Sequence, residues 1–190
     1  MTKPNPANPT LSISRPDLAS ALEQIGAEIE HQPLRSSALA RIMRETFHGS
    51  DAGGTWDWRM AYDLMQATAV QALLRGDNSE DDYYAAKLLA SRLLTETRRS
   101  EQQIRLQQFS TPLPFAALTV RAAAIRKGET VLEPSAGTGA PAAFAARAGA
   151  TLLLNEIDPF RQHLLRAVFG GEVTGHDGEH IDDLLQTPVL

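Results

Sequence analysis

Apolar residues in the first half of the chain recur three and four positions apart, the spacing of one face of an α-helix. Ser14 precedes the first of these stripes, and its hydroxyl is well placed to cap a helix. Thr55 and Ser79 precede two later stripes in the same way. The stripes consist of Leu18, Leu22, Ile25 and Ile29; Leu39, Ile42, Met43 and Phe47; Trp58, Met65, Ala69 and Leu73; and Leu88, Leu89 and Leu93. We predict a flexible tail over residues 1–12 and a helical region over 13–100.

The second half of the chain alternates short apolar runs with helical patterns. The runs predict strands at 130–133 and 151–155 and a third strand that ends near His176, each followed by a helix. Residues 187–190 look like the start of a fourth strand. Strands and helices in alternation are typical of a parallel sheet. We therefore expect an α/β fold with three to four parallel strands within residues 101–190, preceded by the helical region.

The first predicted strand ends in an acid and a turn of small residues, Glu133-Pro134-Ser135-Ala136-Gly137-Thr138-Gly139. Glycine lets the backbone approach a ligand closely because it has no Cβ. An alanine-rich helix follows, so the turn presents free N–H groups at a helix N-terminus. Open α/β sheets bind nucleotide-like ligands at this position, beyond the carboxyl ends of the strands. Acids also follow the second strand, at Glu156 and Asp158, and the third, at Asp177.

The composition narrows the class of protein only slightly. A formal charge of −5 argues against a chain that coats nucleic acid electrostatically, although a local basic face is compatible with binding to DNA. There is no cysteine, which excludes disulfides and thiolate metal sites and suits a cytoplasmic protein. No apolar run is long enough to span a membrane, and residues 1–9 lack the apolar core of a secretory signal. We expect a cytoplasmic globular protein with no membrane partner.

Three motifs, in a fixed order, carry a resemblance to a known family. They are Phe-Ser-Thr-Pro at 109–112, the glycine turn at 133–139 and Asn-Glu-Ile-Asp at 155–158. Together they resemble the S-adenosylmethionine-binding half of N6-adenine DNA methyltransferases. With the lead-in Thr-Arg-Arg-Ser-Glu-Gln at 97–102, residues 95–185 look more closely like the N-terminal methylase region of strawberry-notch-like methylase/helicase proteins of plasmids and phages. The resemblance implies a Rossmann-like class I methyltransferase fold, and it is loose in the first half of the chain.

S-adenosylmethionine, the cofactor that the resemblance implies, presents an ammonium, a carboxylate, a ribose diol and an adenine. The ammonium needs a carboxylate, and Glu133 is the expected one. In dinucleotide folds one carboxylate, ~20 residues beyond the glycine turn, accepts hydrogen bonds from both ribose hydroxyls. Glu156 has that position here. The resemblance places Thr111 and Pro112 near the methionine carboxylate, where a hydroxyl and backbone N–H groups donate.

Two further residues are expected at the adenine. Ile157 would pack on its face, and Asp177 would accept a hydrogen bond from its amino group, as the family pattern implies. The expected cofactor-binding residues are Phe109, Thr111, Pro112, Glu133, Pro134, Ser135, Ala136, Gly137, Gly139, Glu156, Ile157 and Asp177. No residue is assigned to catalysis or to a metal.

Several of these positions also have a purely structural interpretation. Glu133 could serve only to cap the loop that follows it, and Asp158 suits a helix cap better than a ligand contact. Pro141 departs from the family, which has a larger aliphatic residue there, and its ring could narrow the cofactor pocket. His176, Glu179 and His180 could form a metal cluster through the i, i+4 histidines, but no further ligand is evident, which favours solvated loop and helix residues over a metal site.

Aromatic and basic residues leave a role in binding nucleic acid open. Trp56 and Trp58 could stack on bases, but at helical spacing beside methionines they are more typical of a core. Arg98, Arg99 and Arg105 suit a phosphate contact and a solvated helix face equally.

The family's catalytic tetrapeptide, Asn/Asp/Ser-Pro-Pro-aromatic, does not occur in the sequence. We therefore expect the cofactor-binding portion of a DNA adenine-N6 methyltransferase-like protein, truncated before that motif and not catalytic by itself. Its partners would be DNA, the C-terminal remainder of the methylase/helicase or another protein, and a second copy bound through the open edge of the sheet. The alternative is a non-catalytic binding or regulatory module of a mobile genetic element. An unrelated nucleotide binder would leave the Phe-Ser-Thr-Pro segment unexplained.

Overall fold

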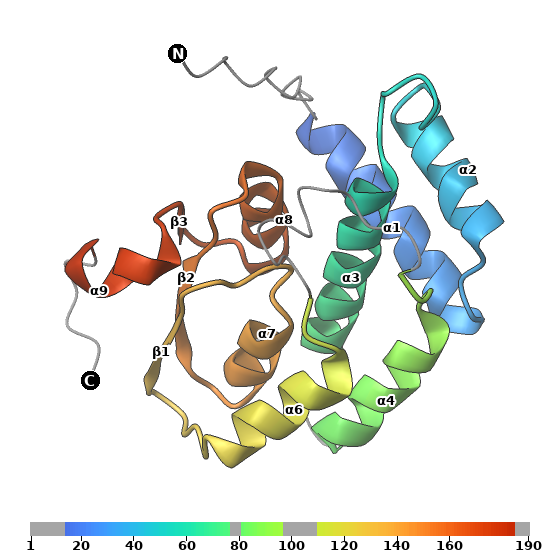
Figure 1. Ribbon diagram of the computed structural model, residues 1–190. Helices are drawn as coiled ribbons and strands as arrows, with labels where there is room; N and C mark the ends of the chain where they lie inside the picture. Colours follow the sequence, from blue (N-terminus) through green and yellow to red (C-terminus); the bar gives the residue numbers. More distant parts are fainter. Residues whose placement is uncertain (1–13, 77–80, 97–109, 185–190) are drawn as a thin grey trace, which may run out of the picture.

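The computed structural model describes residues 14–76, 81–96 and 110–184 and shows a mixed α/β fold (Figure 1). Helices come first, and a small parallel sheet with its own helices follows. The helices before the sheet are α1 (Arg15–His31), α2 (Ser36–Thr46), α3 (Trp58–Arg75), α4 (Asp82–Arg92) and α6 (Leu113–Ala122). The sheet and its helices are β1 (Thr130–Glu133), α7 (Ala140–Arg147), β2 (Thr151–Asn155), α8 (Pro159–Phe169), β3 (Val173–Thr174), the 3-10 helix η1 (Gly178–His180) and α9 (Ile181–Leu184). The predicted tail and the predicted fourth strand lie outside the described residues.

Side-chain caps account for where several helices begin. The N–H of Asp17 donates to the hydroxyl of Ser14 at 3.2 Å, which confirms the predicted cap of α1. The prediction that Thr55 caps the third helix is wrong, because Asp57 caps α3 and accepts from the N–H of Met60 at 2.7 Å. The hydroxyl of Thr55 instead donates to the carbonyl of Ser50 within the preceding loop, at 3.2 Å. A carboxylate two residues closer to the apolar stripe therefore replaces the hydroxyl as the cap.

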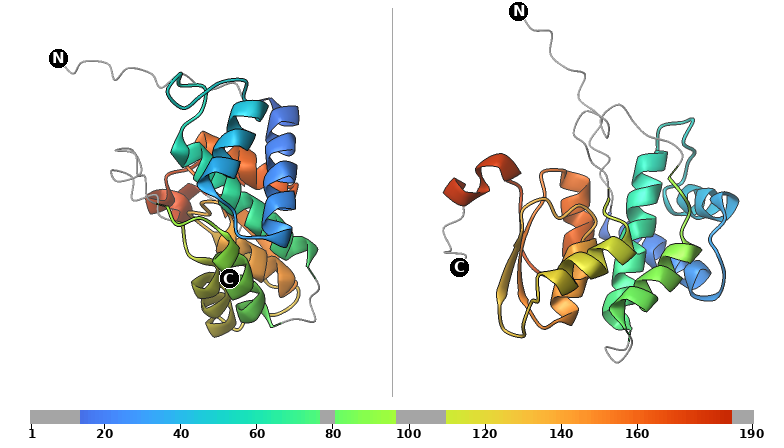
Figure 2. Two further views of the ribbon diagram at one scale, coloured as in Figure 1. Left: turned by 90° about the vertical axis from the view of Figure 1, so that its right-hand side faces the viewer. Right: turned by 60° about the horizontal axis from the view of Figure 1, so that its bottom comes forward.

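The sheet has the strand order β1-β2-β3, and all three strands are parallel. Thr130 lies opposite Thr151, and Leu154 lies opposite Val173. The strands are added in sequence order, β1 to β2 to β3, so two crossovers of the usual right hand place α7 and α8 on the same face of the sheet. Figure 1 shows both helices on that side. In the right-hand view of Figure 2, the short α9 is the one described helix on the other side of the strands, near one end of the sheet. The sheet is thus one outer layer of the described structure.

Two clusters of buried side chains hold these layers together. The larger cluster, which we call the helical core, lies among α1, α2 and α3 and extends into α6, α7 and α8. The smaller cluster, the sheet core, lies between the strands and helices α7 and α8. Its buried members are Ala136, Ala142, Leu154, Leu165 and Val173. Because α3 packs directly on α7 and α8, the helical region and the α/β half share one continuous core.

Within the described ranges, no helix combines the length and the apolar character needed to cross a bilayer.

Candidate functional site

A single buried side chain, Asn155, ties together the carboxyl ends of the three strands. Its amide nitrogen donates to the carbonyl of Pro134 at 2.8 Å and to that of His176 at 3.0 Å. Its amide oxygen accepts from the N–H of His176 at 2.9 Å and from the hydroxyl of Thr174 at 2.7 Å. The segments that follow β1, β2 and β3 therefore meet at one edge of the sheet. Sequence reasoning missed this role, although an asparagine at the end of an apolar strand is a signal for it.

The predicted glycine turn is present between β1 and α7. Gly137 has φ +58° and Gly139 φ +92°, both in the left-handed region that favours glycine. A Cβ on Gly139 would lie 2.6 Å from the ring of Phe169, so packing against α8 already explains this glycine. A Cβ on Gly137 would meet nothing closer than the Arg161 guanidinium at 3.9 Å, which leaves this stretch of backbone approachable. Gly139 is the N-cap residue of α7 and supplies no side chain to cap it.

Glu156, expected at the ribose, is buried, with 4% of its surface exposed. One carboxylate oxygen accepts from the N–H of Gly137 at 2.7 Å, and the other accepts from the N–H of Asp158 at 2.8 Å. Burial raises the pKa of Glu156, and the two backbone N–H groups and the charge of Arg161 oppose this shift only in part. The carboxylate thus fastens the glycine turn to the end of β2. A diol bound here would share these oxygens with the backbone.

Glu133 and Asp177 flank the turn on the other strand ends. Glu133 is half-buried, and burial raises its pKa although the N–H of Ser135 donates to it. This bond is the loop cap that its structural interpretation predicts. Asp177 is exposed, and its carboxylate accepts from the N–H of Glu179 at 3.1 Å at the start of η1. A Cβ on the next residue, Gly178, would lie 3.1 Å from the carbonyl oxygen of Pro134, so the turn after β3 lies against the turn after β1.

The remaining expected residues lie around this edge or outside the described ranges. Ile157 is 50% exposed, unusually so for a large apolar side chain beside a buried carboxylate. Thr111 and Pro112 are exposed at the start of α6, where Pro112 is the N-cap residue. Pro141 occupies the first turn of α7 and is half-buried. Phe109 lies outside the described residues.

Asp158 caps α8, as predicted, and belongs to a network of buried charges. Its carboxylate accepts from the N–H groups of Phe160 and Arg161, and it pairs with Arg59 of α3 at 2.7 Å. Burial by itself would raise the pKa of Asp158, but the charge and hydrogen bond of Arg59, together with the N–H and charge of Arg161, outweigh burial and hold this pKa below its usual value. Arg161 makes two hydrogen bonds to one oxygen of Asp63, at 3.1 and 2.8 Å. Burial disfavours the charge of Arg161, but the carboxylates of Asp63, Glu156 and Asp158 together outweigh burial and raise the pKa of Arg161.

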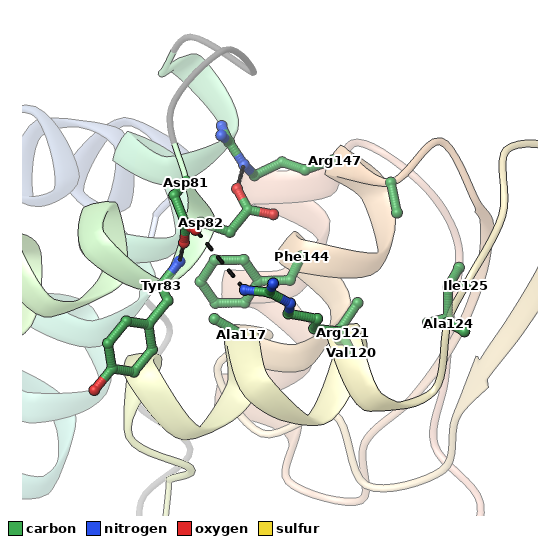
Figure 3. A pocket seen from close by; sticks show the side chains of 11 residues that line it. Asp81, Asp82, Tyr83, Ala117, Val120, Arg121, Ala124, Ile125, Phe144 and Arg147 are labelled. Atoms are coloured by element: carbon green, nitrogen blue, oxygen red, sulfur yellow. Dashed lines mark hydrogen bonds and ion pairs between the residues drawn. The ribbon is translucent and has the colours of Figure 1, made fainter.

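A pocket of about 370 Å³ lies elsewhere in the molecule (Figure 3). The C-terminal halves of α6 and α7 line it, together with the start of α4. It is therefore at the other end of α7 from the glycine turn. Arg147 crosses its wall, donating to Asp82 at 2.7 Å and to the carbonyl of Leu73 at 2.7 Å. The Arg147 guanidinium is thus already bound by protein groups. The pocket lies at a different end of the fold from the expected cofactor residues.

The structure describes the tryptophans and the histidines for which the sequence left alternatives open. Trp56 is buried in the helical core and its indole N–H donates to the carbonyl of Gly49 at 3.1 Å, which confirms the core interpretation. Trp58 packs partly buried against the same core. His180 is exposed, and among residues 14–76, 81–96 and 110–184 no three metal-ligating side chains lie close enough to hold an ion. The arginines expected near a phosphate, Arg98, Arg99 and Arg105, lie outside the described residues.

Comparisons of the chain with protein-family models, with curated proteins and with solved structures gave no significant match.

Proposed function

We propose that this chain is the S-adenosylmethionine-binding portion of a DNA adenine-N6 methyltransferase-like protein with a Rossmann-like class I fold. One observation carries the proposal. A glycine turn at the start of α7 lies beside Glu133, Glu156 and Asp177, which follow three adjacent parallel strands. Ligands of open α/β sheets bind beyond the carboxyl ends of the strands, where these groups lie.

The residues at this edge match the chemical groups of the cofactor. In the proposed arrangement Glu133 pairs with the methionine ammonium, and the backbone at Gly137 lies along the ligand. Glu156 accepts from the ribose hydroxyls, and the exposed Ile157 packs on the adenine. Asp177 is exposed and accepts from the adenine amino group. An ammonium, a diol and an amino group each have a carboxylate, which is the donor set of S-adenosylmethionine.

The methionine carboxylate has a partner at the start of α6. The Thr111 hydroxyl is exposed there and can donate to it, beside Pro112. S-adenosylmethionine, when bound, supplies an activated methyl group for transfer to an amine. In a duplex the target adenine must leave the base stack to reach that group. We assign no residue of this chain to the transfer step and propose that further residues, in cis or from a partner, complete it.

Titration calorimetry with S-adenosylmethionine and S-adenosylhomocysteine tests the proposal. We expect saturable binding that weakens severalfold in Asp177→Asn, since the acceptor of the adenine amino group loses its charge and with it part of the hydrogen-bond strength. Glu172→Gln is the matched control, because Glu172 is an exposed acid at the opposite end of β3. Glu156→Ala is a poorer choice, because it would also strand the N–H groups of Gly137 and Asp158. An absence of heat at millimolar ligand would contradict the proposal.

A second candidate, a binding module that acts through protein partners, is favoured by the β1 edge of the described sheet and by the sheet face opposite α7 and α8. Parallel sheets are normally covered on both faces. Here Leu132 and Leu153 are half-exposed and belong to neither buried cluster, and among the described strands β1 is an edge strand. The proposed partner is a second copy, because a two-fold axis beside β1 would pair the two β1 strands antiparallel.

Sedimentation over a wide concentration range tests the second candidate. We expect a reversible dimer at high micromolar concentration. A strictly monomeric protein at the highest concentration would exclude a self-partner.

A further inference from the structure

Helix α3 of the helical region carries a polar stripe that faces the candidate site. The stripe consists of Arg59, Asp63 and Gln66, which follow one another at four and three residues and so share one side of the helix. Its neighbours Leu64 and Met65 belong to the helical core. The apolar pattern of α3 gives no reason for polar residues on its inward side. These residues contact segments outside α3, at the loops and helix that surround the glycine turn.

Each residue of the stripe contacts a different segment around the glycine turn. Arg59 pairs with Asp158, two residues beyond Glu156, at 2.7 Å. Asp63 accepts two hydrogen bonds from Arg161 of α8. Gln66 accepts from the hydroxyl of Thr138, which lies between the two glycines of the turn, at 3.1 Å. One straight element thereby contacts the loop after β1, the loop after β2 and the helix after β2.

These contacts continue to the groups expected to meet the cofactor. The N–H of Asp158 donates to Glu156, and the same carboxylate accepts from Gly137. The Arg161 guanidinium lies near Gly137, 3.9 Å from the position that a Cβ would occupy there, and its charge attracts the carboxylate of Glu156. The amide nitrogen of Gln66 also donates to Glu96, so the orientation of its oxygen toward Thr138 is fixed from the other side.

Buried charges and amides are an expensive way to stabilise a fold. The side chains of Asp63 and Arg161 are each 3% exposed, and a buried ion pair often adds little net stability over apolar residues of the same size. Such groups do, however, set one geometry out of several that apolar packing would allow. Polar contacts aimed at a turn and at the carboxylate that fastens it are suited to setting that geometry.

We propose that the Arg59, Asp63 and Gln66 stripe of α3 is a set of positioning residues for the cofactor site. It holds the glycine turn and Glu156 in the conformation that the ligand meets. The consequence for cofactor affinity rests on the proposed function, but the holding of the turn does not. The helical region is then a working part of the site and not only a support for the fold.

Two isosteric substitutions separate positioning from general stability. Thr138→Val removes the hydroxyl that donates a hydrogen bond to Gln66, and Thr138→Ser retains a hydroxyl. Thr68→Val is the matched control. Thr68 is a buried threonine of α3, the helix of Gln66, and its hydroxyl donates within that helix to the carbonyl of Leu64 at 2.8 Å. Gln66→Met removes the acceptor from the α3 side at similar side-chain length.

Amide hydrogen exchange of the ligand-free protein, followed by NMR, tests the holding of the turn. We expect exchange at the Gly137 amide to be about tenfold faster in Thr138→Val and in Gln66→Met. Exchange should be unchanged in Thr138→Ser and Thr68→Val, after correction by core amides of α3 that report global unfolding. Unchanged exchange at Gly137 in both test variants would overturn the proposal. So would an equal acceleration in Thr68→Val.

Calorimetry with S-adenosylhomocysteine on the same variants tests the consequence for binding. We expect about a tenfold loss of affinity in Thr138→Val and recovery to within about threefold in Thr138→Ser. Faster exchange at Gly137 with no binding by the wild-type protein would refute the proposed cofactor and leave the positioning role intact. Wild-type binding that is equally tight in Thr138→Val would refute a positioning role in affinity.

Discussion

The helical core and the sheet edge that carries the candidate site are built from different forces. The helical core contains large, fully buried apolar side chains from five helices, among them Ile42, Leu64 and Phe144. The sheet core has five buried members, two of them alanines, and β3 contributes only two residues to the sheet. At the sheet edge, hydrogen bonds of Asn155 and Glu156 and the charges of α3 take the place of apolar packing.

The difference indicates a division of labour. Apolar burial is non-directional and supplies most of the free energy of folding. Hydrogen bonds and ion pairs are directional and add less net free energy, but they define where backbone N–H groups and carboxylates lie. The site is thus expected to respond to changes that leave the fold intact, and the fold to changes far from the site.

The largest effect is expected in the helical core. Leu64→Ala should lower the free energy of unfolding by about 3 to 5 kcal/mol, because a fully buried leucine leaves a cavity. Urea denaturation followed by circular dichroism measures this change. Leu118→Ala, at a leucine of α6 that is 44% exposed, is the control and should cost less than about 1 kcal/mol. Equal losses in the two variants would remove the basis of the comparison.

A smaller loss is expected where α3 meets the sheet edge. Asp158→Asn should cost about 3 kcal/mol at neutral pH, because Arg59 then loses its closest buried partner. The pKa of Asp158 is lowered in the folded state, so its contribution is present above pH 3.8 and is lost as the pH falls through the lowered pKa. Denaturation at several pH values should show the difference from wild type shrinking below pH 3.8. Asp183→Asn, at an exposed acid of α9, is the control and should change the free energy of unfolding little at neutral pH.

The glycine turn and the C-terminus of α8 offer a paired test of packing in the sheet core. Gly139→Ala should cost about 2 to 3 kcal/mol, because φ is +92° and the added Cβ would lie 2.6 Å from Phe169. Gly170→Ala should cost only about 1 kcal/mol, because φ is +73° but nothing lies within 4 Å of its Cβ. Thermal denaturation of both variants measures the difference. Equal costs would mean that the turn yields around the new methyl group.

The smallest effect is a pH dependence of the proposed cofactor binding. Burial raises the pKa of both Glu133 and Glu156, and each must be ionised to accept from the ligand. Affinity for S-adenosylmethionine should therefore fall severalfold on acidification while the pH is still above 4.5, the usual value for glutamate. Calorimetry between pH 8 and pH 5 measures this, and a flat profile would argue against either carboxylate as a partner.

Much of the fold was predictable because its signals are local. The strands Thr130–Glu133 and Thr151–Asn155 and the helix Ala140–Arg147 lie where the apolar runs and glycines predict them. The error at Thr55 has the same origin, because two capping residues compete within one short loop and only the loop's own hydrogen bonds decide between them. For the site, the sequence places acids after strands but does not show that Glu156 is buried and already bonded to the turn.

The sequence by itself determined the order of elements, the caps of α1 and α8 and the position of the glycine turn, because each depends on residues a few positions apart. Only the tertiary structure decided which face of α3 meets that turn. The partners of the contacts from Gln66, Asp63 and Arg59 are 72, 98 and 99 positions away along the chain. Arg59 and Asp63 also pair with each other four residues apart, at 3.9 Å, but that local pair does not show which other segments they contact. Their role emerges when folding brings α7 and α8 against α3 and removes water from between them.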